Sequence, residues 1–573
     1  MKKILLLSSF VALASVAATA EFIEPSVYEN GGFCGFSPNG QYTAAQCYGT
    51  VIIVDVKNGV HYSYEVSDFN EYSIGNGNSF SNTGIIVGST TPIVDAAYWE
   101  NGEWHQLPTS QYEGLNNLTN GITPDGSRIC GTIGLEPVSL DTDNTMQIPV
   151  VWERKEDGTY SEPIRLPYPE KDFTNRAPQY ATALCISDDG KTIVGQVTDC
   201  SGFFQFPIAY IEDAEGKWTY KYLCYNKIIP EGTVVEYPGD YPEGPDASDY
   251  MTEAEQAAYQ AAYQEWVMGG YQGDMPEESS FMTAEEKAAY DQAKAEHDAK
   301  VDEWTPKSEA FYDTLAGLLD NAPAFEFNDV HITPNGKTYI SSDGVNMSEP
   351  GSWFPEMHYT PWLIDIETED VTKLNFDKSM SINSVANDNV YFACNGQGNI
   401  PMTGYIIENG KYTDLYDFLS AKSPEMKEWV EQFLIELVPD YEMDENGDFI
   451  EVNKEYKYTG MTYASADLGQ LAFWNDCPSD YNLYAKGYLC DLSQFSGVKD
   501  VISAGKNTIK FDKEGNLIVD GDIKNMSVYD LSGREILTTA KPQGIVSSKL
   551  SSGIYIVKAH TTDGASFSAK IAK

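Results

Sequence analysis

The chain has 573 residues, 42% of them hydrophobic and 13% aromatic, which is a globular composition and excludes a disordered chain. It carries 86 acidic against 37 basic residues, a formal net charge of −49 at pH 7. Such a surface repels phosphate backbones and anionic headgroups, so we expect no nucleic-acid partner and no direct binding to lipid. Solubility in a crowded exterior is the simplest explanation of the charge. Divalent cation binding is the alternative, but the nearest segment to a calcium loop, 444–448, is better explained as an Asn-Gly hairpin, and we expect no metal.

The first twenty residues have the pattern of an export signal. Lys2 and Lys3 precede the apolar run 4–16, and Ala18-Thr19-Ala20 provides the small residues that a signal peptidase accepts. We therefore predict a Sec signal peptide over residues 1–20. The apolar run is too short to cross a membrane and no comparable run follows, so we expect no transmembrane segment.

Residues 21–497 contain a short turn motif that recurs about seven times, each time before an alternating, β-rich run. Proline presets φ for a turn, Asn or Asp tolerates the next position, and Gly takes the positive φ that closes a tight hairpin. The copies therefore mark one repeated strand-turn-strand unit. The clearest are Phe36-Ser37-Pro38-Asn39-Gly40, Ile122-Thr123-Pro124-Asp125-Gly126, Ile186-Ser187-Asp188-Asp189-Gly190 and Ile332-Thr333-Pro334-Asn335-Gly336, and looser copies have Gly84, Asn389 and Gly469 at the glycine position.

Most units have a second half, an aromatic strand that ends in another turn. Trp99, Trp152 and Trp362 occupy equivalent positions in it, which favours a place in the core over a place in a sugar-binding surface. Two hairpins make four strands, and four strands in roughly 40 to 50 residues is the period of a propeller blade. We predict a mainly β fold, a seven-bladed β-propeller. Its successive blades should hold Gly40, Gly126, Gly190 and Gly336 in the same hairpin.

The combination of an Ile-Ser-x-Asp-Gly turn, a Val/Gly-rich strand and an aromatic strand resembles the HAF-type exported β-propeller repeat. The match is clearest over residues 190–195 and 206–210. The resemblance implies an exported propeller and specifies neither a ligand nor a reaction.

Two insertions interrupt the repeats and are predicted to be helical, at about 240–320 and 423–438. Capping boxes open two helices of the first, at Thr252 and Thr283, and Ser423-Pro424 is an N-cap with proline at the first position of the second. Helices added to a blade loop commonly shape a binding face. Residues 250–304 should form an antiparallel pair in which Tyr259, Tyr263 and Trp266 face Tyr290, Val301 and Trp304.

The last seventy-odd residues differ in character. Residues 501–573 hold ten basic and seven acidic residues, in a chain that is otherwise far more acidic. Their short alternating segments around Gly turns predict a small Ig-like β-sandwich over 498–573, with Val528, Leu531, Ile554 and Ile556 in its core.

This segment resembles the C-terminal sorting domain of the type IX secretion system of Bacteroidota. The resemblance implies Sec export, passage of the folded cargo through the outer membrane by the type IX machinery, and then release or attachment at the outer-membrane cell surface. The segments that carry it are "VYDLSGRE" and "LSSGIYIVK", with Tyr529, Asp530, Leu531, Gly533, Arg534, Gly553, Ile554 and Tyr555 as the motif residues.

Motifs of catalysis and metal binding are missing from the sequence. There is no GxSxG, HExxH, P-loop or GxGxxG after a strand, and the six histidines are scattered. The nine cysteines form no CxxC, and Cys34, Cys130, Cys185 and Cys394 are best explained as small buried hydrophobes. We name no catalytic residue and expect no cofactor. Trp353, Phe354 and His358 are the better candidates for an exposed surface.

Three functions remain open. The sequence favours a secreted or cell-surface binding module that presents a propeller face to a glycan or a partner protein. The alternatives are a propeller-fold glycan lyase or glycosidase and a structural or adhesive surface protein, because fold alone does not indicate an enzyme. Several acids, or acids with a histidine, gathered in one pocket at the channel mouth would favour the enzyme.

Overall fold

A computed structural model describes residues 22–572 with gaps, and the predicted signal peptide lies outside the described residues. The gaps are residues 30, 48–49, 66–70, 75–77, 92–93, 110–116, 135–146, 203, 320–327, 348–356, 396–401, 444–448, 476–485, 496–500, 505–506, 512–515, 521–522, 530–533, 543, 548–549, 551–553 and 562–565.

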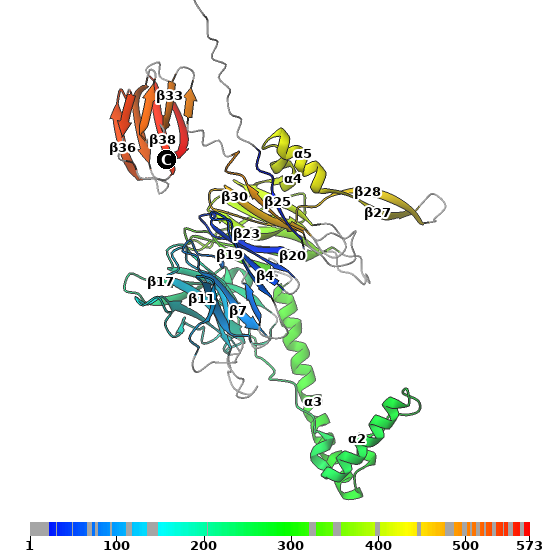
Figure 1. Ribbon diagram of the computed structural model, residues 1–573. Coiled ribbons are helices and arrows are strands. Elements are labelled where there is room, and N and C mark those ends of the chain that lie inside the picture. Colours follow the sequence, from blue (N-terminus) through cyan, green and yellow to red (C-terminus); the bar gives the residue numbers. More distant parts are fainter. Residues whose placement is uncertain are drawn as a thin grey trace, which may run out of the picture.

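Apart from one separate hairpin, the described strands of residues 26–491 fall into seven units of antiparallel strands, which we number in chain order (Figure 1). A parallel pairing of Gln147 with Tyr180 joins the third and fourth units into one nine-stranded sheet. Unit one contains β2 (Gly32–Phe36), β3 (Tyr42–Cys47), β4 (Thr50–Asp55) and β5 (Val60–Glu65). Unit two contains β6 (Glu71–Ile74), β7 (Ile86–Thr91), β8 (Ala96–Glu100) and β9 (Glu103–Gln106). Unit three contains β10 (Leu118–Ile122), β11 (Arg128–Gly134), β12 (Gln147–Glu153) and β13 (Ile164–Arg165).

In unit four the first strand is broken into β14 (Tyr180–Ala181) and β15 (Cys185–Ile186), followed by β16 (Thr192–Thr198), β17 (Gln205–Glu212) and β18 (Trp218–Tyr222). Unit five contains β19 (Asn328–Ile332), β20 (Thr338–Asn346), β21 (Met357–Asp365) and β22 (Val371–Lys373). Unit six contains β23 (Ser381–Asn387), β24 (Val390–Asn395), β25 (Thr403–Glu408) and β26 (Lys411–Asp414). Unit seven contains β29 (Met461–Ala464), β30 (Gln470–Asn475) and β31 (Lys486–Asp491), and its outer strand is β1 (Ser26–Glu29).

The units close into a ring. Around it, β15 contacts β10 and β19, and β23 contacts β19 and β29. Unit two meets unit one through β6 and β3, and it meets unit three through β7 and β10. The ring closes where β29 contacts β2 and where β1, from the start of the chain, pairs with β31. A ring of radial four-stranded sheets is the β-propeller that the repeat predicts.

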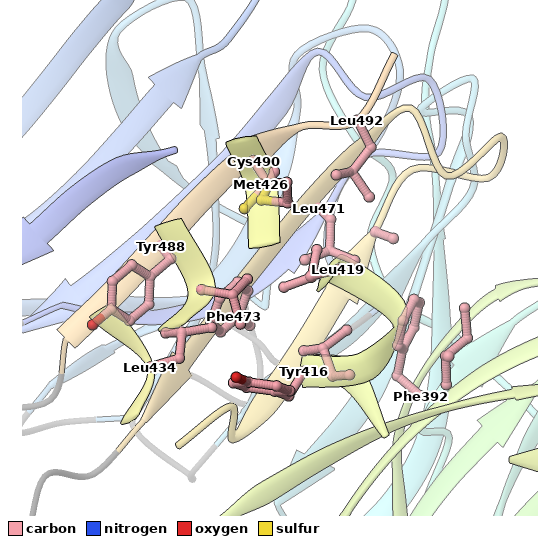
Figure 2. Close-up of a cluster of buried hydrophobic side chains, with 14 of the residues drawn as sticks. Phe392, Tyr416, Leu419, Met426, Leu434, Leu471, Phe473, Tyr488, Cys490 and Leu492 are labelled. Atoms are coloured by element: carbon pink, nitrogen blue, oxygen red, sulfur yellow. The ribbon is translucent and has the colours of Figure 1, made fainter. Parts of the chain in front are cut away.

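The hydrophobic core consists of separate clusters, each between two neighbouring units. Trp99, Trp152 and Trp362 lie in the third strands and are buried, as their repeat positions predict. Figure 2 shows the cluster between units six and seven, in which Phe392 and Phe473 are buried together with side chains of two helices. The described cysteines are all free, and the four named from the sequence are buried.

These two helices belong to the second insertion and are α4 (Leu415–Ser420) and α5 (Pro424–Phe433). Ser423 caps α5 as predicted, because its hydroxyl accepts the Met426 N–H at 3.1 Å. The prediction of helix to 438 is wrong. Residues beyond Phe433 enter the hairpin β27 (Ile435–Met443) and β28 (Phe449–Lys457), because Pro439 disfavours helical backbone in the residue before it.

The first insertion is a helical arm that projects from the propeller (Figure 1). It contains α2 (Glu253–Met268) and the 36-residue α3 (Ala284–Leu319), with short 3₁₀ turns at Ala247–Tyr250 and Glu278–Ser280, after the one-turn α1 (Tyr225–Ile228). Both predicted capping boxes are present. The base of α3 docks on the propeller through Phe311 and Leu315, which pack on Phe173, Phe204 and Phe206.

The predicted pairing of aromatic faces within the arm is wrong. The α2 side chains pack on the segment that follows α2, with Tyr259 on Phe281 and Trp266 on Tyr271. Those of α3 pack on the segment that precedes α2, with Trp304 on Tyr241 and Tyr290 on Tyr250. Helix α2 buries no residue. Its aromatic side chains contact the segment that follows it and do not pack into a core with α3.

The C-terminal segment folds as two four-stranded sheets, drawn apart from the propeller in Figure 1. One contains β32 (Val501–Ala504), β33 (Asn507–Phe511), β34 (Leu517–Asp520) and β37 (Gly544–Ser547), and the other β36 (Glu535–Ala540), β35 (Ile523–Tyr529), β38 (Ile554–Thr561) and β39 (Ser566–Ala572). Val528 lies in the shared core as predicted. Ile556 is only half-buried, because the alternation of β38 turns Tyr555 and Val557 inward instead. No helix among the described residues is long and apolar enough to cross a membrane.

Candidate functional site

The site is built from the turns that join the first and second strands of the units, and the fourth unit illustrates their geometry. The Ser187 hydroxyl is fully buried and donates to Asp189 Oδ1 at 2.7 Å. It also accepts the N–H of Thr192 at 3.0 Å, and the Gly190 N–H donates to the Ser187 carbonyl at 2.9 Å. Gly190 has φ +71°, a conformation that glycine adopts without steric cost. One hydroxyl therefore fixes the whole turn.

The same hydroxyl bond recurs in four other units. Gly40, Gly126, Gly190 and Gly336 lie in equivalent turns with φ between 71° and 74°, as predicted. In unit seven Leu468 takes the positive φ in place of the predicted Gly469. The bonds are Ser37 to Asn39 (2.9 Å), Thr123 to Asp125 (2.7 Å), Thr333 to Asn335 (2.9 Å) and Ser465 to Asp467 (2.7 Å).

Unit six departs from this pattern. Its turn is shorter, because Asn387 pairs directly with Val390 and leaves only Asp388 and Asn389 between the strands. Neither Val385 nor Ala386 offers a hydroxyl there. Asp388 therefore stands at the tip of a turn without the Ser or Thr hydroxyl of the other units, and the Tyr391 hydroxyl donates to its carbonyl instead, at 3.0 Å.

Hydrogen bonds join the turns of neighbouring units around the ring. The Ala466 N–H donates to Pro38 O at 2.8 Å, and the Asn82 N–H donates to Pro124 O at 2.7 Å. Further bonds run from Arg128 Nη1 to Gly190 O (2.9 Å), from Asp188 N to Pro334 O (2.9 Å), from Asn335 N to Asp388 Oδ1 (3.0 Å) and from Asn387 Nδ2 to Ala466 O (2.8 Å). The turns together form a hydrogen-bonded rim.

The rim surrounds a cavity of about 540 Å³ on the axis of the propeller. Its walls come from the inner ends of units one, two and four to seven and are partly apolar, with Phe36, Phe80, Ile186 and Ile332 among them. Asn78 of unit two reaches across unit three, because its Oδ1 accepts the Ile186 N–H at 3.2 Å. A volume of this size is in the range that encloses a small organic ligand.

Two carboxylates, Asp188 and Asp388, lie at the cavity. Asp188 takes the position that Pro38, Pro124 and Pro334 occupy in the other clear copies of the turn. Its side chain stays accessible because it faces the open cavity, yet protein atoms of several units surround it. This burial, and then the negative charges of Asp388 and Asp189, raise the pKa of Asp188 to about 6.

His331 is a third titratable group of the cavity wall. Its Nε2 is inaccessible to solvent and has no hydrogen-bond partner among the described residues. Burial lowers the pKa of His331, against the opposing effect of Asp329, so the imidazole is neutral at pH 7. The cavity therefore holds two acids and a neutral histidine, and none of its described lining residues is Lys or Arg.

A separate group of possible metal ligands lies in the loops of unit four, at Asp172, Asp199 and Cys200. Asp199 is fully buried, but its carboxylate already accepts the N–H groups of Ser201 and Phe204. Burial, and then the charge of Asp199, raise the pKa of Asp172. The carboxylates of Asp172 and Asp199 thus serve as acceptors for backbone N–H groups of their own loops, which explains their position without a metal ion.

Of the residues named from the sequence, Cys185 lines the cavity, while His358 and the described residues of the sorting motif do not. His358 is in β21 and half-buried, while Trp353 and Phe354 lie outside the described residues. Among the sorting motif residues, Tyr529 is half-buried, Arg534 is exposed and Tyr555 is in the sandwich core. Ile554 begins β38, and Asp530, Leu531, Gly533 and Gly553 lie outside the described residues.

Sequence reasoning did not single out Asp188, Asp388 or His331 as site residues. With 86 acids in the chain, no pair stands out by number. One signal was nevertheless present, because Asp188 replaces the proline of the repeat at the inner turn of unit four.

Comparison with known proteins identifies the C-terminal sheets. Residues 503–573 match the family described as the secretion system C-terminal sorting domain. They form a type IX sorting domain. Such a domain implies export by type IX secretion, to the cell surface or to the medium. Among curated proteins no sequence relative is found.

Several solved structures are similar to the chain at low identity. The β-propeller domain of the trilobed protease from Pyrococcus furiosus is 8% identical with a TM-score of 0.29, covering 94% of this chain and 92% of that one. The β-propeller domain of Cps50 (Swd1) from Myceliophteria thermophila is 8% identical with a TM-score of 0.27, covering 95% and 100%. Prolyl oligopeptidase B from Galerina marginata is 10% identical with a TM-score of 0.33, covering 78% and 46%. At these identities the likeness concerns the fold alone.

The buried hydroxyl of unit four gives a first prediction. We expect Ser187→Ala to lower the free energy of unfolding by about 1–3 kcal/mol, because the half-buried Thr192 N–H loses its acceptor and the buried hydroxyl bond to Asp189 is lost. Urea denaturation followed by tryptophan fluorescence measures the change. The matched control is Thr159→Ala in the exposed outer turn of unit three, where we expect a change within about 0.5 kcal/mol. Equal losses in the two variants would contradict the role of the hydroxyl.

The carboxyl pair gives a second prediction, which NMR titration of the side-chain carboxyl carbons checks. Asp188 should titrate near pH 6, and Asp388→Asn should lower its pKa by removing a neighbouring charge. Because the folded pKa exceeds the ordinary value of about 4, the contribution of Asp188 to stability decreases as pH rises from about 4 to 6. Asp188→Asn should therefore gain stability over the wild type at pH 7 and lose that advantage at pH 4. A pKa of Asp188 near 4 in both the wild type and Asp388→Asn would contradict the effect of burial and of the Asp388 charge.

Proposed function

We propose that this chain is an exported binding module of a Bacteroidota bacterium, whose ligand enters the axial cavity of the propeller. A Sec signal peptide at residues 1–20 would direct the first export step, and the sorting domain at 498–573 the second. The mature protein would then act in the medium or attached to the outer-membrane surface. Its ligand would be a glycan or an exposed segment of a partner protein.

The observation that carries this proposal is the cavity itself, about 540 Å³ with partly apolar walls and a polar rim. The rim is held in place by bonds between units, so the site is formed before the ligand arrives. Binding to a site of fixed shape avoids the entropy cost of ordering loops. Its polar groups come from turns, where side chains can vary without disturbing the sheets.

A second function, a glycan-active enzyme, is favoured by one specific observation. Asp188, with its pKa raised to about 6, stands at the same cavity as a second carboxylate, Asp388. A protonated acid and an ionised partner are the pair that glycosidases use. His331 adds nothing to such a mechanism, because its Nε2 is closed to solvent. New reducing ends released from a glycan library by the wild type, and not by Asp188→Asn, would favour the enzyme over the binding module.

Blocking the cavity tests the binding proposal. We expect Ala466→Trp to abolish binding, since Ala466 lines the cavity and holds its place in the rim through backbone atoms alone. Glycan and peptide arrays probed with the full chain measure the loss, which should be at least tenfold in affinity, or about 1.4 kcal/mol. The control Ala214→Trp adds the same ring to an exposed outer turn of unit four and should leave binding unchanged. Undiminished binding by Ala466→Trp would place the ligand elsewhere.

Removing residues 498–573 tests the destination. The two C-terminal sheets have their own core, so the truncated chain should keep a folded propeller but remain in the periplasm of a type IX-competent host. Cell fractionation with immunoblotting measures its location, and the unaltered chain in the same host is the control. Wild-type amounts at the cell surface or in the medium would show that another segment directs export.

A further inference from the structure

The negative charge of the axial cavity is concentrated at Asp188 and Asp388, while much of the remaining lining is apolar. This uneven distribution of charge indicates a class of ligand. The inference rests on the proposed function of the cavity as a binding site. Asp188 and Asp388 flank a single peptide of unit five, because one bonds to Pro334 and the other to Asn335. Consecutive Cα atoms are about 3.8 Å apart, so the two acids are brought to one sector of the rim.

The two carboxylates differ in how many of their hydrogen-bonding positions are already used. Asp388 Oδ1 accepts the Asn335 N–H at 3.0 Å. No described residue donates a hydrogen bond to the carboxylate of Asp188, whose backbone N–H alone takes part in the rim. An ionised carboxylate accepts up to four hydrogen bonds, so Asp188 offers acceptor positions that face the cavity.

No positive charge balances the acids from within the cavity. Lys191 and Lys337 follow the turns of units four and five and are exposed, and Arg128, which bonds to Gly190 O, is paired with Glu153 and Glu212. None of these three basic residues lines the cavity. Asp189 is bound within its own turn by Ser187 and the Lys191 N–H, and it adds negative charge. His331 is neutral at pH 7. The sector between units four and six is therefore negative, and it would repel a carboxylate, phosphate or sulfate.

The inner walls fit an apolar group beside this charge. Phe36, Phe80, Ile186 and Val385 line the same cavity. Among the described residues, no third acid, His or Cys lies close enough to Asp188 and Asp388 to complete a group of metal ligands. An ammonium group needs up to three acceptors, and a short hydrocarbon stem would lie against the aromatic and aliphatic walls.

We propose that the axial cavity binds an alkylammonium ion, a primary amine on a short apolar stem, with the ammonium group at Asp188 and Asp388. The amine would come from a free small molecule or from a lysine side chain of a partner protein. Asp188 is the principal acceptor, and Asp388 contributes its charge and its remaining oxygen. The substitution of aspartate for the proline of the repeat is thus explained by ligand binding.

Calorimetric titration of the full chain at pH 7.5 tests this inference. The probes are butylammonium, butanol and butyrate, which share one stem and differ in charge, and Nα-acetyl-lysine methylamide represents the protein-borne amine. We expect measurable binding of butylammonium and at least tenfold weaker binding of butanol and butyrate. Stronger binding of the lysine derivative than of butylammonium would assign the source to a protein partner, and the reverse order to a free amine.

Two variants that remove charge alone locate the ammonium group. We expect Asp188→Asn to weaken butylammonium binding at least tenfold, and Asp388→Asn to weaken it to a smaller extent. The matched control is Asp213→Asn, in the exposed outer turn of the same unit, which should stay within about twofold. Affinity in the wild type should also decrease between pH 7.5 and 5 as Asp188 takes up a proton. Unchanged binding in Asp188→Asn, or equal binding of butanol, would overturn the inference.

Failure of this inference can be told apart from failure of the proposed function. If Ala466→Trp abolishes the binding of some neutral ligand while Asp188→Asn has no effect, the cavity is the site and only the cationic class is wrong. If Ala466→Trp binds butylammonium as well as the wild type, the cavity is not the site and both proposals fail. Folding of each variant is checked by its urea midpoint.

Discussion

The architecture depends on a hydroxyl group buried at the inner end of most units. A Ser or Thr hydroxyl there forms hydrogen bonds with polar groups of its own turn and fixes the conformation of that turn. The remaining backbone N–H and C=O groups of the turn then form hydrogen bonds with the next unit. Because the bond is local, each unit can form it independently. Because the turns then bond to each other, the same small group positions the rim of the axial cavity. Local turn chemistry, ring closure and the shape of the site are thus consequences of one interaction.

The candidate site lies at the two units whose inner turns depart from the repeated sequence pattern. In unit four, Asp188 takes the place of the proline of the repeat. Unit six has no Ser or Thr hydroxyl at its inner turn, and this turn is shorter and has Asp388 at its tip. Both changes place a carboxylate at the cavity in a protein whose net charge is already −49. The field of the whole surface and the local charge have the same sign, so both would attract a cation to the cavity.

The features that depend on neighbouring residues in the sequence were predictable. The inner turns with Gly40 and Gly190, the caps at Thr252 and Ser423, and the sorting segment all follow from short patterns. Features set by tertiary contacts were not. Nothing in the sequence of α2 determines that Trp266 meets Tyr271 of the following loop, and not Trp304 of α3. The convergence of Asp188 and Asp388 likewise depends on ring closure, which brings together turns that are far apart in the chain.

The pairing of β1 with β31 joins residues such as Tyr28 and Gly487, which lie at opposite ends of the propeller sequence. Contacts of such high contact order form slowly, so this pair should be among the last to form during folding. Until then the outer edge of β31 presents unpaired N–H and C=O groups, and an exposed strand edge is a template for aggregation. Because β31 is synthesised only after nearly the whole array, β1 must wait for its partner, and the chain with an unclosed ring is the state most exposed to aggregation.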